Sequence, residues 1–231
     1  MEKIFEKHET LICMSLIILY VVVNSFCLQN FDTTDYRIVI INTVFSGLLI
    51  LIMFLLKRTR YYGLKKVEDA KKYLYFIPLI IIISANLWGG ININNEPLEI
   101  LFHILTMLNI GFIEEIIFRG FLFKMMEKSE VKSAIIVSSI TFGIGHIVNL
   151  LNGANLIPTL IQICYAISIG FLFVIIFYKS KSLLPCIITH ALFNGLSILN
   201  NDYTIVSEYI VPIFLIIMPI WYAIYIIKKV K

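Results

Sequence analysis

Three short stretches of this sequence place acidic, imidazole and amide side chains inside otherwise apolar runs. Residues 109–122, NIGFIEEIIFRGFL, contain Glu114, Glu115 and Arg119; residues 141–146, TFGIGH, end at His146; and residues 190–194, HALFN, contain His190 and Asn194. A charged side chain at the centre of a bilayer costs about 2.5–3.5 kcal/mol on insertion scales, so it normally faces a protein interior or a wet cavity. The three stretches therefore predict a polar site inside an apolar protein.

These residue types can activate water. A carboxylate and an imidazole that share a water molecule can remove its proton and later return it to a leaving amine, and Glu114 and His146 are the candidates for this role. Asn194 and His190 can stabilise the oxyanion that forms when a peptide carbonyl becomes tetrahedral. Taken singly, each residue is as well explained by hydrogen bonds between helices, which average about 0.6 kcal/mol. Together they favour catalysis.

Helix geometry predicts how their neighbours are arranged. Glu115 and Arg119 lie four residues apart, one helical turn, and this spacing predicts an ion pair separate from the catalytic set. Glu114 is turned about 100° away from that pair. Phe142 shares a helix face with His146, and the intervening glycines, Gly143 and Gly145, are expected to allow a close helix approach.

The composition identifies the elements that must hold these residues. Of 231 residues, 59% are hydrophobic and 15% are charged, and the mean hydropathy is +0.90; soluble domains average about 45–50% apolar and about 25% charged residues. We therefore expect an all-α, polytopic membrane helical bundle, with residues 1–231 forming a single integral membrane domain. About eight transmembrane helices are predicted, near residues 10–28, 37–56, 73–90, 98–122, 132–151, 159–178, 182–199 and 206–227. The catalytic core is expected at about 97–200, after peripheral N-terminal spans within residues 1–96.

The basic residues predict the orientation. They gather after the second, fourth, sixth and eighth spans, whereas the opposite loops hold a single one, Arg37. The positive-inside rule then places both termini in the cytoplasm of a multi-pass protein of the cell membrane. The net charge of +4 follows from this topology. We expect the lipid bilayer as a partner and no nucleic acid.

Depth in the membrane tests whether the polar residues can meet. At about 1.5 Å per residue from the nearest cytoplasmic lysine, Glu114 lies ~15 Å deep, His146 ~21 Å, His190 ~13 Å and Asn194 ~20 Å. All four fall in one layer, and we expect them to line one cavity. His103 lies ~16 Å further toward the outer side, which predicts an interfacial or packed histidine.

The three stretches also resemble a known family. EEIIFR, FGIGH and HALFN are similar to the motifs EExxxR, FxxxH and HxxxN of the CPBP (CAAX protease and bacteriocin-processing, or Abi) intramembrane endopeptidases, which are related to type II CAAX prenyl proteases. The resemblance covers about residues 97–200. It implies that Glu114 and His146 activate water and that His190 and Asn194 form the oxyanion hole. Glu115 and Arg119 would support the site or meet the substrate, a peptide or membrane protein.

Several alternatives stay open. The family is commonly labelled as metalloproteases, and a Glu/His/His set can hold zinc in principle. We expect no required cofactor, because a Glu–His base needs no metal and the helical HExxH arrangement is absent. A bacteriocin immunity protein, or a peptide maturation or export protein, with little proteolysis would have the same fold. A transporter or proton relay that uses the same polar residues is the alternative of another class.

Overall fold

The computed structural model describes residues 2–69, 76–201 and 204–230, and it is built from helices. The first part comprises α1 (Glu2–Lys7), α2 (Glu9–Asn30), α3 (Tyr36–Leu55), and α4 (Ile77–Ser84) with its 3-10 extension η2 (Ala85–Leu87). The central part comprises α5 (Pro97–Glu115), the π-helical η3 (Ile116–Phe123), α6 (Lys124–Glu127), α7 (Val131–Gly145) and the 3-10 helix η4 (His146–Leu150). The last part comprises α8 (Leu156–Ser180), α9 (Leu184–Gly195), η5 (Leu196–Leu199), η6 (Val206–Ile210) and α10 (Val211–Lys229).

The helical membrane bundle predicted from the composition is confirmed. Within the described residues, six helices are long and apolar enough to cross a membrane: Glu9–Asn30, Tyr36–Leu55, Pro97–Glu127, Val131–Leu150, Leu156–Ser180 and Val206–Lys229. The other two expected spans are shorter apolar helices, Ile77–Leu87 and Leu184–Leu199. The span predicted at 73–90 begins in residues 73–75, which lie outside the described part of the chain.

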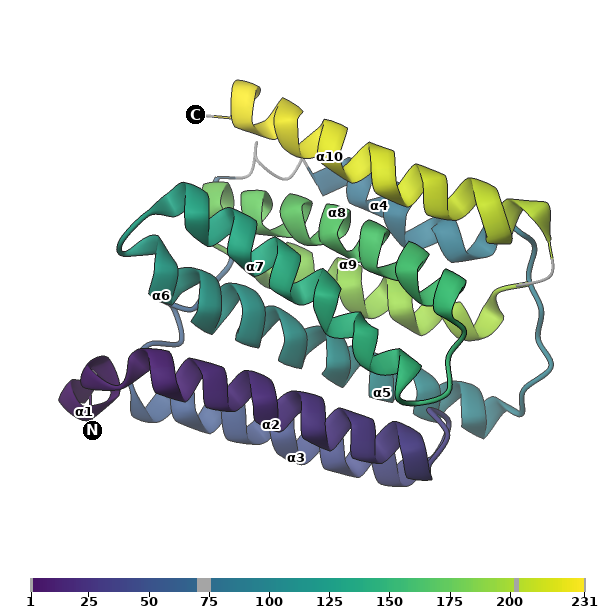
Figure 1. Cartoon of the computed structure of the whole chain (residues 1–231), viewed down its shortest axis with the longest axis horizontal. Helices are drawn as coiled ribbons and strands as arrows, with labels where there is room; N and C mark the ends of the chain where they lie inside the picture. The colour runs from purple at the N-terminus through teal and green to yellow at the C-terminus, as the bar shows by residue number, and fades with distance from the viewer. Residues whose placement is uncertain (1, 70–75, 202–203, 231) are drawn as a thin grey trace.

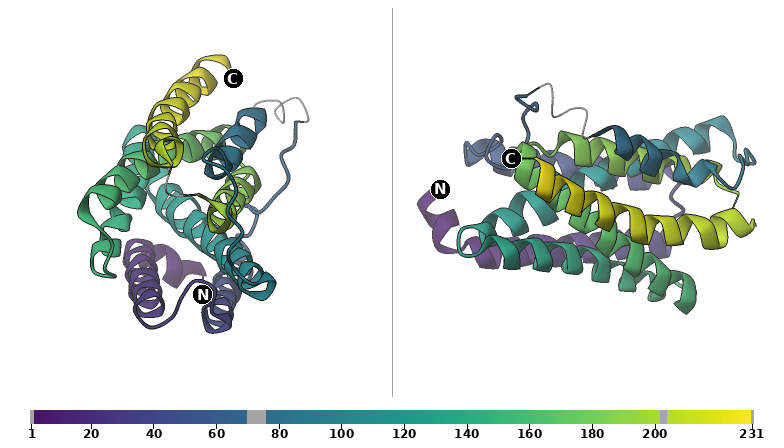
Figure 2. Two further views of the ribbon diagram at one scale, coloured as in Figure 1. Left: turned by 90° about the vertical axis from the view of Figure 1, so that its right-hand side faces the viewer. Right: turned by 90° about the horizontal axis from the view of Figure 1, so that it is seen from above.

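The helices run roughly parallel or antiparallel to one another (Figure 1). In both Figure 1 and the end-on view of Figure 2, α2 and α3 lie along one side of the bundle and α10 lies along the opposite side. Between them, α5 packs against α3 and α9, and α8 packs against α7 and α10. The two ends of the chain and the α6–α7 turn lie at the same end of the bundle (Figure 1).

Helix α5 carries the two glutamates. It begins with a capping box in which Glu96 and Glu99 bond each other's backbone, and Pro97 stands at its first turn, where a missing N–H does no harm. Beyond Glu115 the helix widens into η3, and every residue of η3 is buried. The site residues of this segment therefore sit in the packed interior, with Arg119 among them.

Two glycines let helices approach closely at the site. A Cβ on Gly111 of α5 would lie 2.9 Å from the backbone nitrogen of Ala191 in α9. A Cβ on Gly143 of α7 would lie 2.8 Å from the backbone nitrogen of Ile167 in α8, which confirms the close approach expected there. The same expectation for Gly145 is wrong, since no described residue of another helix comes within 4 Å of its Cβ position.

We expect Gly111→Ala to destabilise the protein, because the added methyl group would clash with the backbone of α9, which cannot move as a side chain can. Overpacking of this kind costs about 1–3 kcal/mol, so the unfolding temperature of the purified protein should fall. Gly47→Ala in α3 is the matched control: beyond the backbone of its own helix, no described residue comes within 4 Å of its Cβ position, and alanine favours a helix by up to about 1 kcal/mol over glycine. Equal unfolding temperatures for the two variants would contradict the close α5–α9 contact.

Candidate active site

Glu114 lies at the centre of the polar residues. Its side chain stands near the end of α5 and the residue is 8% exposed. The hydroxyl of Tyr20, from α2, donates a hydrogen bond of 2.5 Å to its Oε1 atom. Its Oε2 atom lies 3.4 Å from Nε2 of His190 and is buried without a hydrogen-bond partner among the described residues. One carboxylate oxygen is thus held, and the other is available.

His190 connects the two glutamates. Its Nδ1 atom lies 2.9 Å from Oε1 of Glu115, and the same oxygen accepts a hydrogen bond of 3.0 Å from Nη1 of Arg119. An ionised carboxylate has no proton to donate, so Nδ1 of His190 is the donor toward Glu115. A hydrogen bond between Nε2 and Glu114 then needs one further proton, carried either by the ring or by the carboxyl group.

The predicted Glu115–Arg119 ion pair is confirmed, and both side chains are 0% exposed. The expectation that the pair stands apart from the catalytic candidates is wrong, because His190 bonds the same oxygen of Glu115. The reason is the packing of α9 on α5 at Gly111, which spacing along a single helix does not encode.

Phe142 packs against three of the charged or ionisable groups. The guanidinium carbon of Arg119 lies 4.1 Å from the centroid of its ring, close enough for a cation–π interaction. The rings of His146 and His190 meet the same ring edge-on, with centroids 5.6 Å and 5.7 Å away. Gly170 of α8 leaves the room for this arrangement, since a Cβ there would lie 3.1 Å from both Arg119 and Phe142. Phe142 therefore lies in contact with all three groups, and its supporting role stays a prediction.

The candidate residues line two cavities that share Phe142 and His146. The larger, of about 70 Å³, is bounded by Ile82, Phe142, His146, Gln162, Tyr165, Ala166, Ile169, Phe173, His190, Phe193 and Asn194. The smaller, of about 40 Å³, is bounded by Tyr20, Val21, Asn24, Glu114, Phe118, Phe142, Gly145, His146, Val148 and Asn149. The expectation of one cavity for all four candidates is thus corrected: His146, His190 and Asn194 share the first, while Glu114 and His146 share the second.

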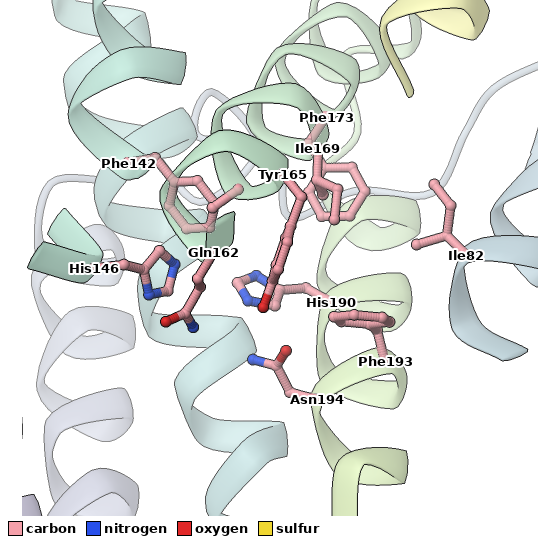
Figure 3. Close-up of a pocket in the computed structure, with 11 residues that line it drawn as sticks. Ile82, Phe142, His146, Gln162, Tyr165, Ile169, Phe173, His190, Phe193 and Asn194 are labelled. Atoms are coloured by element: carbon pink, nitrogen blue, oxygen red, sulfur yellow. The ribbon is translucent and has the colours of Figure 1, made fainter. Parts of the chain in front are cut away.

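The larger cavity has a polar side and an apolar side. In Figure 3 the polar ends of His146, Gln162, His190 and Asn194 gather together, while Ile82, Ile169, Phe173 and Phe193 lie toward the other side. The four polar residues come from three successive elements: His146 begins η4, Gln162 lies on α8, and His190 and Asn194 lie on α9. Such a cavity can hold a polar group beside an apolar one.

Comparison with protein families agrees with the motifs. Residues 95–196 match the family model described as type II CAAX prenyl endopeptidase Rce1-like. This segment belongs to the CAAX protease family. The match indicates a membrane protease, for which a lipid bilayer and a peptide or protein substrate are implied. A search of curated proteins and a search of solved structures each gave no match.

The CAAX protease segment contains all the candidates named from the sequence, but sequence reasoning missed four residues. They are Tyr20, Asn24, Asn149 and Gln162, which line the cavities. Asn149, which lines the smaller cavity, donates a hydrogen bond of 2.9 Å to Gln162, which lines the larger one. Asn24 and Gln162 are polar residues inside apolar spans. The same criterion identified Glu114, and it would have identified these two residues as well. Tyr20 gives no comparable signal, because tyrosines are common in membrane helices.

His103 lies away from Glu114, as its depth predicted, and is a packed histidine. Its Nε2 atom lies 3.3 Å from the backbone oxygen of Asn194 and 3.2 Å from the hydroxyl of Ser197, and its Nδ1 atom lies 3.1 Å from the hydroxyl of Thr33. Through these hydrogen bonds His103, on α5, connects the end of α9 and the start of η5 to the α2–α3 loop.

A metal site does not fit the donor geometry. Across residues 2–69, 76–201 and 204–230, no group of three or more His, Cys, Asp or Glu side chains is arranged to hold a metal ion. We therefore derive no step through a metal.

Proposed function

We propose that this protein hydrolyses a peptide bond within the membrane by means of a water molecule activated by Glu114 and His146. The observation that carries the proposal is that these two side chains, an acid and an imidazole, bound the same small cavity. The family match supports the reaction class. The proposal assigns a metal-independent mechanism.

Each residue has a defined role in this reaction. Glu114 takes a proton from water as the water oxygen bonds to the scissile carbonyl carbon, and His146 orients that water. Asn194 and His190, which bound the larger cavity, donate hydrogen bonds to the resulting oxyanion. With its Nδ1 donating to Glu115, His190 can do so from Nε2 only as an imidazolium. When the C–N bond breaks, the proton on Glu114 passes to the leaving amine.

The lining of the larger cavity supports a preference in the substrate. Ile82, Ile169, Phe173 and Phe193 form its apolar side, which suits an apolar side chain next to the scissile bond. A peptide segment that is itself embedded in the membrane meets this requirement.

The proposal is tested with the purified full chain in lipid nanodiscs. We expect hydrolysis of at least one internally quenched peptide from a panel of transmembrane and C-terminally prenylated sequences, and we expect it to persist with EDTA or 1,10-phenanthroline. Asn194→Ala should lower kcat by about 10². Asn30→Ala, the same change at an exposed residue bonded only to its own helix turn, should leave kcat unchanged.

The other outcomes separate the alternatives. Chelator-sensitive cleavage with near-stoichiometric bound metal would contradict the metal-independent mechanism. A proton or solute flux in liposomes with no peptide hydrolysis would support a transporter. Protection against a bacteriocin in cells carrying an inactive Asn194→Ala variant would support an immunity role that needs no proteolysis.

A further inference from the structure

Helix α2 presents two polar side chains to the smaller cavity, although it lies outside the segment that matches the protease family. Tyr20 and Asn24 are four residues apart and therefore share one face of the helix. Tyr20 is 5% exposed, and its hydroxyl bonds Glu114. Both residues line the cavity together with Glu114 and His146.

Two residues that line this cavity each have a buried oxygen that accepts no hydrogen bond from any described residue. These oxygens are Oδ1 of Asn24 and Oε2 of Glu114. A buried acceptor without a partner is unfavourable, because it has lost its hydration and gained nothing in return. The cavity of about 40 Å³ exceeds the roughly 10–15 Å³ that one water molecule needs. A water molecule has two O–H donors, one for each of these acceptors.

We infer that α2 completes the active site: Asn24 and Glu114 hold the attacking water between Oδ1 and Oε2, and Tyr20 aims Glu114 at that water. This inference rests on the proposed function and adds the residues that bind its water. The hydroxyl of Tyr20 donates a hydrogen bond to Oε1 of Glu114, so Oε2 is the oxygen left to accept the proton of the water. Tyr20 is a positioning residue, and its ring is held against Phe45 of α3 with centroids 6.2 Å apart.

The test removes each polar group while keeping the shape of the side chain. Tyr20→Phe deletes only the hydroxyl, and Asn24→Leu deletes the acceptor at similar volume. We expect each variant to lower kcat about tenfold or more with KM unchanged, since both groups are assigned to the water and not to the substrate. Tyr62→Phe is the control: it deletes the hydroxyl of another buried tyrosine, in the loop after α3, and should leave kcat at the wild-type value.

A second measurement does not depend on activity. Tyr20→Phe should lower the unfolding temperature in the wild-type background but not in a Glu114→Ala background, because the hydrogen bond is then already lost. Equal shifts in the two backgrounds overturn the positioning of Glu114 by Tyr20. Peptide cleavage by the wild type with wild-type kcat in Tyr20→Phe and Asn24→Leu overturns the inference and leaves the protease function standing. A wild type that cleaves no peptide in the panel overturns the proposed function together with the water-binding role.

Discussion

Replacing Glu114 with glutamine is expected to lower kcat for peptide hydrolysis by about 10² or more while the yield of folded protein stays unchanged. Glutamine has nearly the same shape and keeps an oxygen that can accept the hydrogen bond from Tyr20. It cannot take a proton from water at neutral pH. The measurement compares kcat, KM and the unfolding temperature of the purified variant with those of the wild type.

Glu99→Gln is the matched control on the same helix. Glu99 belongs to the capping box of α5, and glutamine serves a capping box as well as glutamate does. It stands 15 residues before Glu114 in sequence, about 22 Å along the helix axis, and kcat should be unaffected. A Glu114→Gln variant with the kcat of the wild type would show that another group is the base.

Arg119→Met is expected to reduce the amount of folded protein, because it leaves the carboxylate of Glu115 buried beside His190 without its cationic partner. Breaking a buried pair in this way costs about 3–5 kcal/mol. Arg119 is 0% exposed and packs on Phe142, so in this structure it cannot reach a substrate. The measurement is the monodisperse yield in detergent and the unfolding temperature.

A double variant separates stability from catalysis. Glu115→Leu with Arg119→Met removes both charges, and replacement of a buried ion pair by apolar side chains is often neutral or stabilising. The double variant should therefore unfold at a higher temperature than Arg119→Met. Its kcat should stay low, because His190 has lost the acceptor at Nδ1. Normal abundance of Arg119→Met with loss of turnover alone would favour a direct contact between Arg119 and the substrate.

Relations within one helix could be predicted from the sequence. The ion pair of Glu115 with Arg119 and the shared face of Phe142 and His146 both follow from a spacing of four residues, which helix geometry fixes. The six long apolar helices follow from hydropathy in the same way. These features depend on the order of neighbouring residues and on nothing else in the fold.

Relations between helices could not be predicted. Tyr20 meets Glu114 across 94 residues of sequence, and His190 meets Glu115 across 75. Their contacts depend on which helix faces pack together, and on the glycines that set the distance between α5 and α9. The span predicted at 73–90 extends past Leu87, where the apolar helix of the structure ends. Hydropathy counts apolar residues but does not locate the end of a helix.

The spacing of Glu115 and Arg119 also bears on how the chain enters the membrane. Because both residues lie on one helix, one turn apart, they can neutralise each other before that helix has touched any neighbour. Glu114 has no such partner on its own helix. Its partner Tyr20 lies on α2, which is synthesised earlier and is already available when α5 leaves the ribosome. The order of synthesis thus lets Glu114 and Glu115 each find a hydrogen-bond donor during insertion, before α9 and its histidine exist.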